Sequence, residues 1–279
     1  MSQEFESTAV ELIGGKAAGL GVLVAASVPV PAGFCLTTAA YQAAHTRPGE
    51  VDHEIRAAVA GLRALGARSF AVRSSHVSED RAGTGSPGVY HSMVGLAGDE
   101  EILAAVRQAW ASAGTPAADD YRQRRGVDHR SPSMAVLVQA APTAAAGGVI
   151  YTILPGDGDP SALLIEYAAG PPVNVIDNLA PPHRCVISKR HPGTARPDPA
   201  LLTTEQLQTL VSWSLAAERC IDAPLDLEWL LDPGGRLWML QARRLPYPAV
   251  DPSGPYTAEA AGTTLRSDKL AVAGHAVVA

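Results

Sequence analysis

The sequence predicts an α+β protein with two lobes, and three observations support this fold class. Helical periodicity dominates the first half of the chain, short apolar strands joined by Gly/Pro turns dominate the second half, and the last strands form a β-hairpin pattern. This order favours α+β lobes over a parallel βαβ sheet. With 279 residues, the chain is long enough for two cores. We place the lobes at residues 1–130 and 131–245, followed by a Pro- and Gly-rich tail at 246–279.

The first lobe is expected to contain three helices and a strand. One helix begins at Gly14-Gly15-Lys16 and ends at the break made by Pro29 and Pro31. A short apolar strand is expected at 69–73. Apolar residues at helical spacing predict two further helices. The second of these helices has acidic residues in its first turn, where the helix dipole makes them stabilising. The apolar positions are Val51, Ile55, Val59 and Leu62 in one helix and Ile102, Val106 and Trp110 in the other.

The second lobe is expected to consist mainly of strands. Four apolar stretches separated by Gly/Pro turns have strand length and composition. Thr203 and Gln206 form a capping box, which predicts a helix that begins there and precedes a closing hairpin. The four expected strands lie at residues 134–139, 149–152, 163–167 and 184–188.

The closing hairpin carries polar side chains that suggest a metal site. If Asp232 pairs with Leu237 across the Pro-Gly-Gly turn, Glu228 lies opposite Gln241, and Arg243 shares their face because side chains two apart point the same way. Such groups are costly to bury without a partner. Carboxylate and amide oxygens suit Mg²⁺, and a guanidinium binds phosphate oxygens in a fork. A Glu–Arg pair on a solvated face is the alternative interpretation.

Composition excludes several function classes. The net charge is −6 and no extended basic block occurs, which disfavours nucleic acid as a partner. The three cysteines are widely spaced and form neither a metal pattern nor a disulfide framework, as expected in a reducing cytoplasm. The acidic N-terminus lacks the features of a signal peptide, and no apolar stretch is long enough to cross a membrane. We therefore expect a cytoplasmic protein without a membrane partner.

Two glycine-rich segments are candidates for phosphate binding. Gly14-Gly15-Lys16 opens a helix, whose N-terminal amides attract phosphate while Lys16 adds a positive charge. Arg73 ends an apolar strand and precedes a loop at residues 83–88 whose glycines allow close approach to a ligand. The alternatives are a tight turn with a surface lysine and an ordinary surface loop.

These separate signals occur in an order that resembles one known family. The segments at residues 14–41, 71–80, 226–229 and 240–243 resemble the ATP-binding domain of phosphoenolpyruvate synthase and pyruvate phosphate dikinase, which also occurs in rifampicin phosphotransferase. The resemblance extends over residues 11–245. It implies an ATP-grasp-like fold in which two lobes hold ATP and Mg²⁺.

The resemblance also implies roles for individual residues, of which Arg73, Glu228, Gln241 and Arg243 are the catalytic candidates. By position in the family pattern, Lys16 and Arg73 would contact phosphates, and Arg243 would contact the transferred phosphate. The loop over the nucleotide would contain Gly88, Ser92 and Met93, and Gln139 would lie near the adenine. Glu228 and Gln241 would hold Mg²⁺.

The implied function is a stand-alone Mg-ATP-dependent phosphotransferase. Its acceptor would be a small molecule or a histidine of a separate phosphohistidine carrier protein. One alternative is a non-catalytic nucleotide-binding module, because Pro87-Gly88-Val89 stands where the family usually has Ala-Gly-Gln. A second alternative is an ATP-grasp ligase that joins a carboxylate to an amine, which the fold permits.

Overall fold

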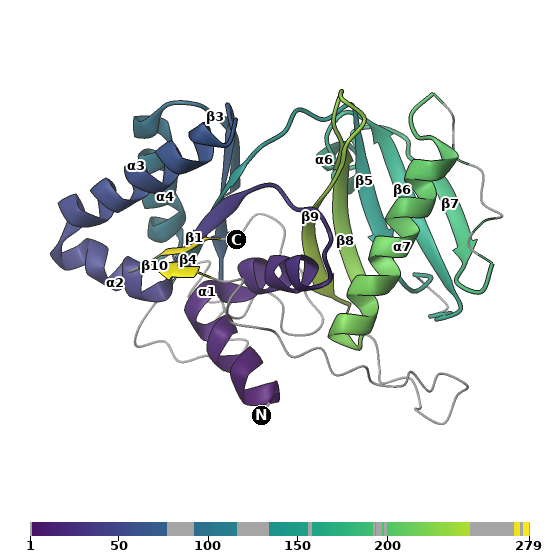
Figure 1. The fold of residues 1–279 in the computed structure, drawn as a ribbon, viewed down its shortest axis with the longest axis horizontal. Helices are drawn as coiled ribbons and strands as arrows, with labels where there is room; N and C mark the ends of the chain where they lie inside the picture. The colour runs from purple at the N-terminus through teal and green to yellow at the C-terminus, as the bar shows by residue number, and fades with distance from the viewer. Residues whose placement is uncertain are drawn as a thin grey trace. The chain divides into compact units, whose positions relative to one another are not determined.

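The computed structural model describes residues 2–76, 92–115, 134–155, 158–191, 193, 197, 200–245, 271–273 and 276–278 (Figure 1). The chain divides into two units, each assembled from separate stretches. Unit 1 comprises Met1–Ala18, Pro31–Pro142 and Arg266–Ala279, and unit 2 comprises Gly19–Val30 and Thr143–Leu265. The lobe boundary expected between residues 130 and 131 lies outside the described residues.

An antiparallel sheet with the strand order β10-β11-β1-β4-β2-β3 forms the centre of unit 1. Two of its strands come from the 246–279 segment that the sequence suggested to be a tail, and β11 pairs with β1. The strands are β1 (Gly33–Leu36), β2 (Phe70–Ser75), β3 (Ser92–Leu96), β4 (Ala135–Ala140), β10 (Ala271–Ala273) and β11 (Ala276–Val278).

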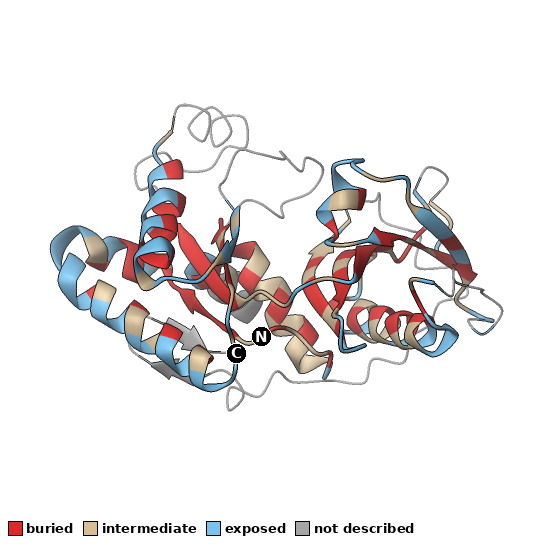
Figure 2. Ribbon diagram, turned by 90° about the horizontal axis from the view of Figure 1, so that it is seen from above, coloured by how far each residue is buried: buried red, intermediate tan, exposed pale blue. Residues whose placement is uncertain are grey.

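Three helices bury the apolar face of this sheet: α2 (Thr38–Thr46), α3 (Pro48–Ala64) and α4 (Asp99–Ser112). Alternate residues of β1, β2 and β4 pack against them in one continuous core. In Figure 2 strands β1, β2 and β4 are mostly red and the outer side of α3 is blue, as expected for an amphipathic helix. The residues that α3 buries are the four predicted from spacing: Val51, Ile55, Val59 and Leu62.

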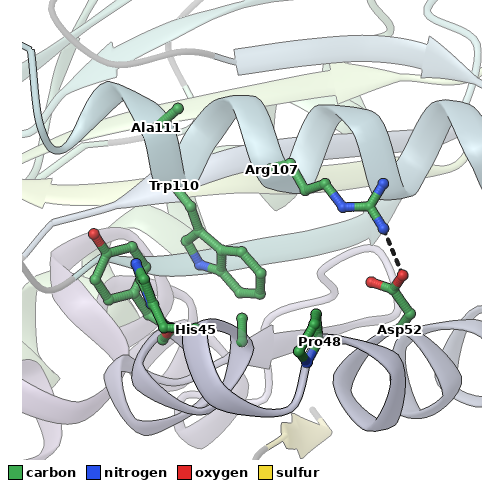
Figure 3. A pocket seen from close by; sticks show the side chains of 8 residues that line it. His45, Pro48, Asp52, Arg107, Trp110 and Ala111 are labelled. Carbon is green, nitrogen blue, oxygen red and sulfur yellow. Dashed lines mark hydrogen bonds and ion pairs between the residues drawn. The ribbon is translucent and has the colours of Figure 1, made fainter.

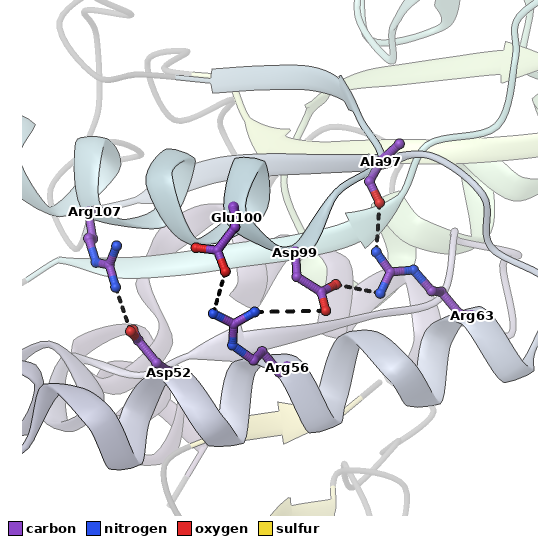
Figure 4. A network of polar contacts seen from close by, with 7 residues as sticks. All are labelled: Asp52, Arg56, Arg63, Ala97, Asp99, Glu100 and Arg107. Carbon is purple, nitrogen blue, oxygen red and sulfur yellow. Dashed lines mark hydrogen bonds and ion pairs between the residues drawn. The ribbon is translucent and has the colours of Figure 1, made fainter.

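Ion pairs join α3 to α4 at the surface of unit 1 (Figure 4). Arg63 pairs with Asp99 and donates to the Ala97 carbonyl oxygen at 2.6 Å. Arg56 donates to Glu100 at 2.6 Å. Exposed pairs contribute at most about 1 kcal/mol each, so this network chiefly fixes how the two helices align.

Unit 2 contains a second antiparallel sheet in the order β7-β6-β5-β8-β9. Helix α7 (Thr204–Ile221) lies along it (Figure 1), and the predicted capping box is confirmed by reciprocal hydrogen bonds between Thr203 and Gln206 of 2.9 and 3.1 Å. The short helix α6 (Val173–Ile176) packs against β5 and β6. The strands are β5 (Ala146–Tyr151), β6 (Ala162–Ala169), β7 (His183–Ser188), β8 (Leu225–Leu231) and β9 (Leu237–Arg244).

The cysteines lead to a prediction about thiol reactivity. Burial raises the pKa of the Cys35 thiol to about 12, and burial also raises that of Cys185, whereas Cys220 is exposed. In the native protein at pH 8, we therefore expect a thiol reagent to label Cys220 alone, because only the thiolate reacts and it must be accessible. Labelling in urea should reach all three cysteines. Mass spectrometry of digested, labelled protein measures both results.

The same shift predicts a pH dependence of stability. Because the unfolded Cys35 thiol releases its proton near its ordinary pKa of 9.0 and the folded one near 12, the free energy of unfolding should fall as pH rises through this interval. Rapid native labelling of Cys35 at pH 8 would contradict the burial on which this rests.

Candidate functional site

The Gly-Gly-Lys segment docks on the end of β2 through a kink in helix α1 (Ser2–Ala25). At the kink, Gly14 has φ 73° and ψ 171°, and a Cβ there would lie 1.9 Å from the Ser75 carbonyl oxygen. The Ser75 hydroxyl donates to the Ile13 carbonyl at 2.8 Å and accepts from the Ala17 N–H at 3.2 Å. It therefore replaces the helical hydrogen bond that would join Ile13 to Ala17.

Docking at β2 places the Lys16 ammonium beside the Arg73-Ser74-Ser75 segment. Lys16 Nζ donates to the Ser74 carbonyl at 2.9 Å. The amides of the restarted helix are used within the protein, because Gly15 N–H donates to the His76 carbonyl at 3.2 Å. The expectation of an amide cradle for phosphate is therefore wrong for Gly15 and Ala17, and Lys16 stays a candidate phosphate ligand.

Arg73 and Gln139 lie on the sheet face of unit 1 that α1 approaches. Residues opposite each other in an antiparallel ladder share a face, and Gln139 pairs with Ala71, two residues before Arg73. Gln139 is buried, and its Nε2 donates to the Pro31 carbonyl at 3.2 Å. A Cβ at Gly33 would lie 2.6 Å from Gln139 Cγ, so this glycine makes room for the amide.

Two residues expected in a loop over the nucleotide lie in strand β3 instead. Ser92 pairs with Arg73 and shares its face, whereas Met93 pairs with Val72 and packs against the apolar core. The loop expectation is wrong for both, and Met93 presents its side chain to the opposite face because side chains alternate along a strand. Gly88 lies outside the described residues.

In unit 2, the predicted register of the β8–β9 hairpin is confirmed at its polar end. Glu228 lies opposite Gln241. The expected pairing of Asp232 with Leu237 is wrong, since Leu231 pairs with Leu237 and a β-bulge beyond Glu228 restores the register. The Asp232 carboxylate accepts from the Arg236 N–H at 3.0 Å and holds the turn.

Asp226 completes the polar face and was not among the predicted site residues. It is buried, lies opposite Arg243 and forms an ion pair with it. Its position two residues before Glu228 was the available signal. Tyr151 lies opposite Asp226 on β5, and burial, followed by the charges of Asp226 and Glu166, raises the pKa of its phenol. At the hairpin, the face therefore combines carboxylates, an amide and a phenol with the guanidinium of Arg243, which is held by Asp226.

The donor set of this hairpin fits magnesium. Glu228 and Gln241 offer a carboxylate and an amide oxygen from directly opposite positions, and both are half-buried. Within the described residues, no group of three or more His, Cys, Asp or Glu side chains could hold a metal. The fit to Mg²⁺ rests on the two oxygen donors themselves, since Mg²⁺ is bound through one or two protein oxygens and takes waters and phosphate oxygens as its other ligands.

The sequence matches a known protein family. The profile described as "Pyruvate phosphate dikinase, AMP/ATP-binding domain" matches residues 44–200, more than half of the chain. This chain belongs to that family. Membership in the AMP/ATP-binding domain family confirms the resemblance, and the chain has the α+β, ATP-grasp-like fold that it implied.

Relatives of this AMP/ATP-binding domain include larger enzymes. The phosphoenolpyruvate synthase of Aeropyrum pernix is 26% identical over 86% of this chain and 41% of its own length. A rifampicin phosphotransferase from Streptomyces sp is 30% identical over 84% of this chain and 34% of its own length. The prodigiosin synthesizing transferase PigC of Serratia marcescens is 29% identical over 83% and 31%, respectively. The chain thus spans roughly a third to two fifths of these relatives.

Among solved structures, D-alanyl-alanine synthetase A from Vibrio cholerae aligns with 86% of this chain and 57% of its own, with a TM-score of 0.46 and 11% identity. An ADP complex of N5-carboxyaminoimidazole ribonucleotide synthetase aligns with 85% of this chain and 45% of its own, with a TM-score of 0.44 and 13% identity.

In the part of this chain that the structure describes, none of the helices has the length and apolar character needed to cross a membrane.

Proposed function

We propose that the chain is an ATP-dependent phosphotransferase of the phosphoenolpyruvate synthase and pyruvate phosphate dikinase type. The observation that carries the proposal is the polar end of the β8–β9 hairpin, where Glu228 faces Gln241 and Asp226 holds Arg243. Phosphoryl transfer needs mainly positioning and charge neutralisation. Two oxygen ligands and a fixed guanidinium on one face supply groups suited to both tasks.

Glu228 and Gln241 are the proposed magnesium ligands. When bound, the metal would neutralise charge on the phosphates of ATP. Arg243 would bind oxygens of the transferred phosphoryl group, since a guanidinium matches them in a fork. The ion pair with Asp226 restricts the Arg243 side chain before the ligand arrives, which lowers the entropic cost of binding.

In unit 1, Lys16 and Arg73 are the proposed phosphate ligands. Both are half-buried, and Lys16 is restrained by its hydrogen bond to the Ser74 carbonyl. Ser92 shares the face of Arg73 and offers a hydroxyl. Gln139 is proposed to lie near the adenine, where its bond to Pro31 would support the ligand-facing backbone. We also propose, from the sequence, that Gly88 lies near the nucleotide, whereas the side chain of Met93 packs against the apolar core.

The relatives suggest a small-molecule acceptor. One is named for rifampicin and another for phosphoenolpyruvate, so the phosphoryl group of ATP would pass to an organic acceptor, directly or through a histidine of a carrier protein. Transfer of the γ-phosphoryl group would leave ADP, and a dikinase route would leave AMP. The chain covers only part of the length of these relatives, so their substrates do not identify its acceptor, and a screen of acceptors is needed to find it.

The non-catalytic nucleotide-binding module is the second candidate. The observation that favours it is that the Gly15 and Ala17 amides donate to His76 and Ser75, which removes them as phosphate ligands. In that case ATP would bind without turnover.

Titration of the protein with ATP by calorimetry, with and without Mg²⁺, tests the proposal. We expect saturable binding that weakens when the metal is removed, and release of ADP or AMP in a screen of acceptors. Metal-dependent binding without turnover in the presence of a range of acceptors and histidine carrier proteins would favour the second candidate. No binding at millimolar ATP would overturn both. ATP consumption that requires both a carboxylic acid and an amine would identify a ligase.

A further inference from the structure

Unit 1 has a pocket that none of the proposed nucleotide-binding residues lines. It has a volume of about 300 Å³, which is at the lower end for small-ligand sites. It lies where α2 and the start of α3 meet α4 (Figure 3). The lining combines apolar and aromatic side chains with one ion pair: Tyr41, Ala44, His45, Pro48, Asp52, Arg107, Trp110 and Ala111.

The aromatic wall is rigid because its rings support one another. The rings of Tyr41 and Trp110 meet edge to face at 6.0 Å, and those of Tyr41 and His45 at 4.9 Å. His45 Nδ1 is 2.9 Å from the Tyr41 carbonyl oxygen, so this nitrogen carries the proton and donates. Tyr41 and Trp110 are more than nine-tenths buried. Such a wall provides flat apolar contact at low entropic cost.

The ion pair supplies a donor and an acceptor side by side. Arg107 Nη2 donates to Asp52 Oδ2 at 2.5 Å (Figure 3). Within the described residues this is the single hydrogen bond that either side chain makes, which leaves Asp52 Oδ1 as an acceptor and the other Arg107 N–H groups as donors. The side chains are 27% and 55% exposed, so a ligand can reach them.

We propose that this pocket binds a small planar aromatic or heteroaromatic molecule that carries an N–H donor next to a carbonyl acceptor, as in a lactam or an aromatic amide. The ligand N–H donates to Asp52, its carbonyl accepts from Arg107, and its ring packs on the aromatic wall. An anionic ligand fits less well because Asp52 already neutralises Arg107. This site is separate from the proposed function and does not depend on it.

The probe that tests this site is 2-pyridone, which has adjacent N–H and C=O groups on a flat ring, and N-methyl-2-pyridone is its matched control because it lacks the donor. The indole N–H resonances of the four tryptophans are followed by NMR, and Trp110→Phe assigns the Trp110 signal. We expect 2-pyridone to shift this signal with a dissociation constant on the order of 1 mM. N-methyl-2-pyridone should bind about tenfold more weakly, as expected for one lost hydrogen bond to a charged group.

A pair of variants tests the assignment of Asp52. Asp52→Ala should weaken binding of 2-pyridone about tenfold and abolish the preference over N-methyl-2-pyridone. Glu50→Ala removes a carboxylate from another ion pair of α3, with Arg47, outside the pocket, and should change neither result.

The unaltered protein decides the proposal even if a variant does not fold. No shift of the Trp110 signal at 20-fold excess over the expected constant, about 20 mM, would overturn it. Equal affinity for the two probes would overturn the assigned donor–acceptor edge. Shifts confined to the other tryptophans would place binding elsewhere and would also overturn it.

Discussion

Replacement of Glu228 by Ala is expected to abolish the magnesium-dependent part of ATP binding and to lower turnover by about a thousandfold or more. Glu228 is the single carboxylate of the proposed metal pair and lies opposite Gln241. A metal that neutralises phosphate charge contributes several kcal/mol to transition-state stabilisation, and about 4 kcal/mol corresponds to a thousandfold change in rate. Calorimetry with ATP, with and without Mg²⁺, and product analysis measure the two effects.

Glu166→Ala is the matched control for this prediction. Glu166 and Glu228 both lie opposite Val149, on the two strands that flank β5, so they share one face of the sheet. Glu166 pairs instead with Arg184, whose side chain is 69% exposed. The control should retain metal-dependent binding. If both variants behaved alike, the effect would come from the charge of the face and the ligand role of Glu228 would be rejected.

Replacement of Lys189 by Ala is expected to destabilise unit 2 by about 3–5 kcal/mol. Lys189 follows β7, its side chain is 6% exposed, and its Nζ lies 2.7 and 2.8 Å from the two carboxylate oxygens of Glu218 on α7. Removal of the lysine leaves a largely buried carboxylate without its cation. Urea unfolding followed by tryptophan fluorescence and circular dichroism measures the loss.

A double variant distinguishes the cost of leaving one buried charge unpaired from the contribution of the ion pair itself. With Lys189→Met and Glu218→Met together, no charge is left unpaired, and most of the lost stability should return. Arg47→Ala at the exposed Arg47–Glu50 pair should change stability by less than about 1 kcal/mol. A small effect of Lys189→Ala itself would show that water reaches Glu218 in solution.

Local patterns were sufficient to predict helices α3, α4 and α7 and the polar hairpin, whereas α2 and α6 were not predicted. The buried residues of α3 follow from a spacing that any helix shares. The pairing of Glu228 with Gln241 was predicted although the pairing at the turn was off by one residue. The two apolar runs fix which face each side chain takes, and a slip of one residue would expose the core.

Features that depend on distant contacts could not be predicted. The Ser75 hydroxyl enters α1 through a contact between residues 62 apart in sequence, and no local pattern encodes such a contact. Met93 was expected beside a ligand, yet its pairing with Val72 turns it to the core. Strand β1 has four residues, too few to show a clear period. Asp226 could have been placed opposite Arg243 from the predicted register, but only the structure shows that the two side chains form an ion pair and that Asp226 is buried.

The β-bulge between Glu228 and Trp229 has a consequence for tolerance to insertion and deletion. On the turn side of the bulge Leu231 pairs with Leu237, and on the other side Glu228 pairs with Gln241, so the two ends of the hairpin keep separate registers. The turn residues Pro233 to Arg236 are exposed. This turn is therefore a suitable place to insert a loop, a label or an affinity tag without changing which residues face each other at the proposed metal pair.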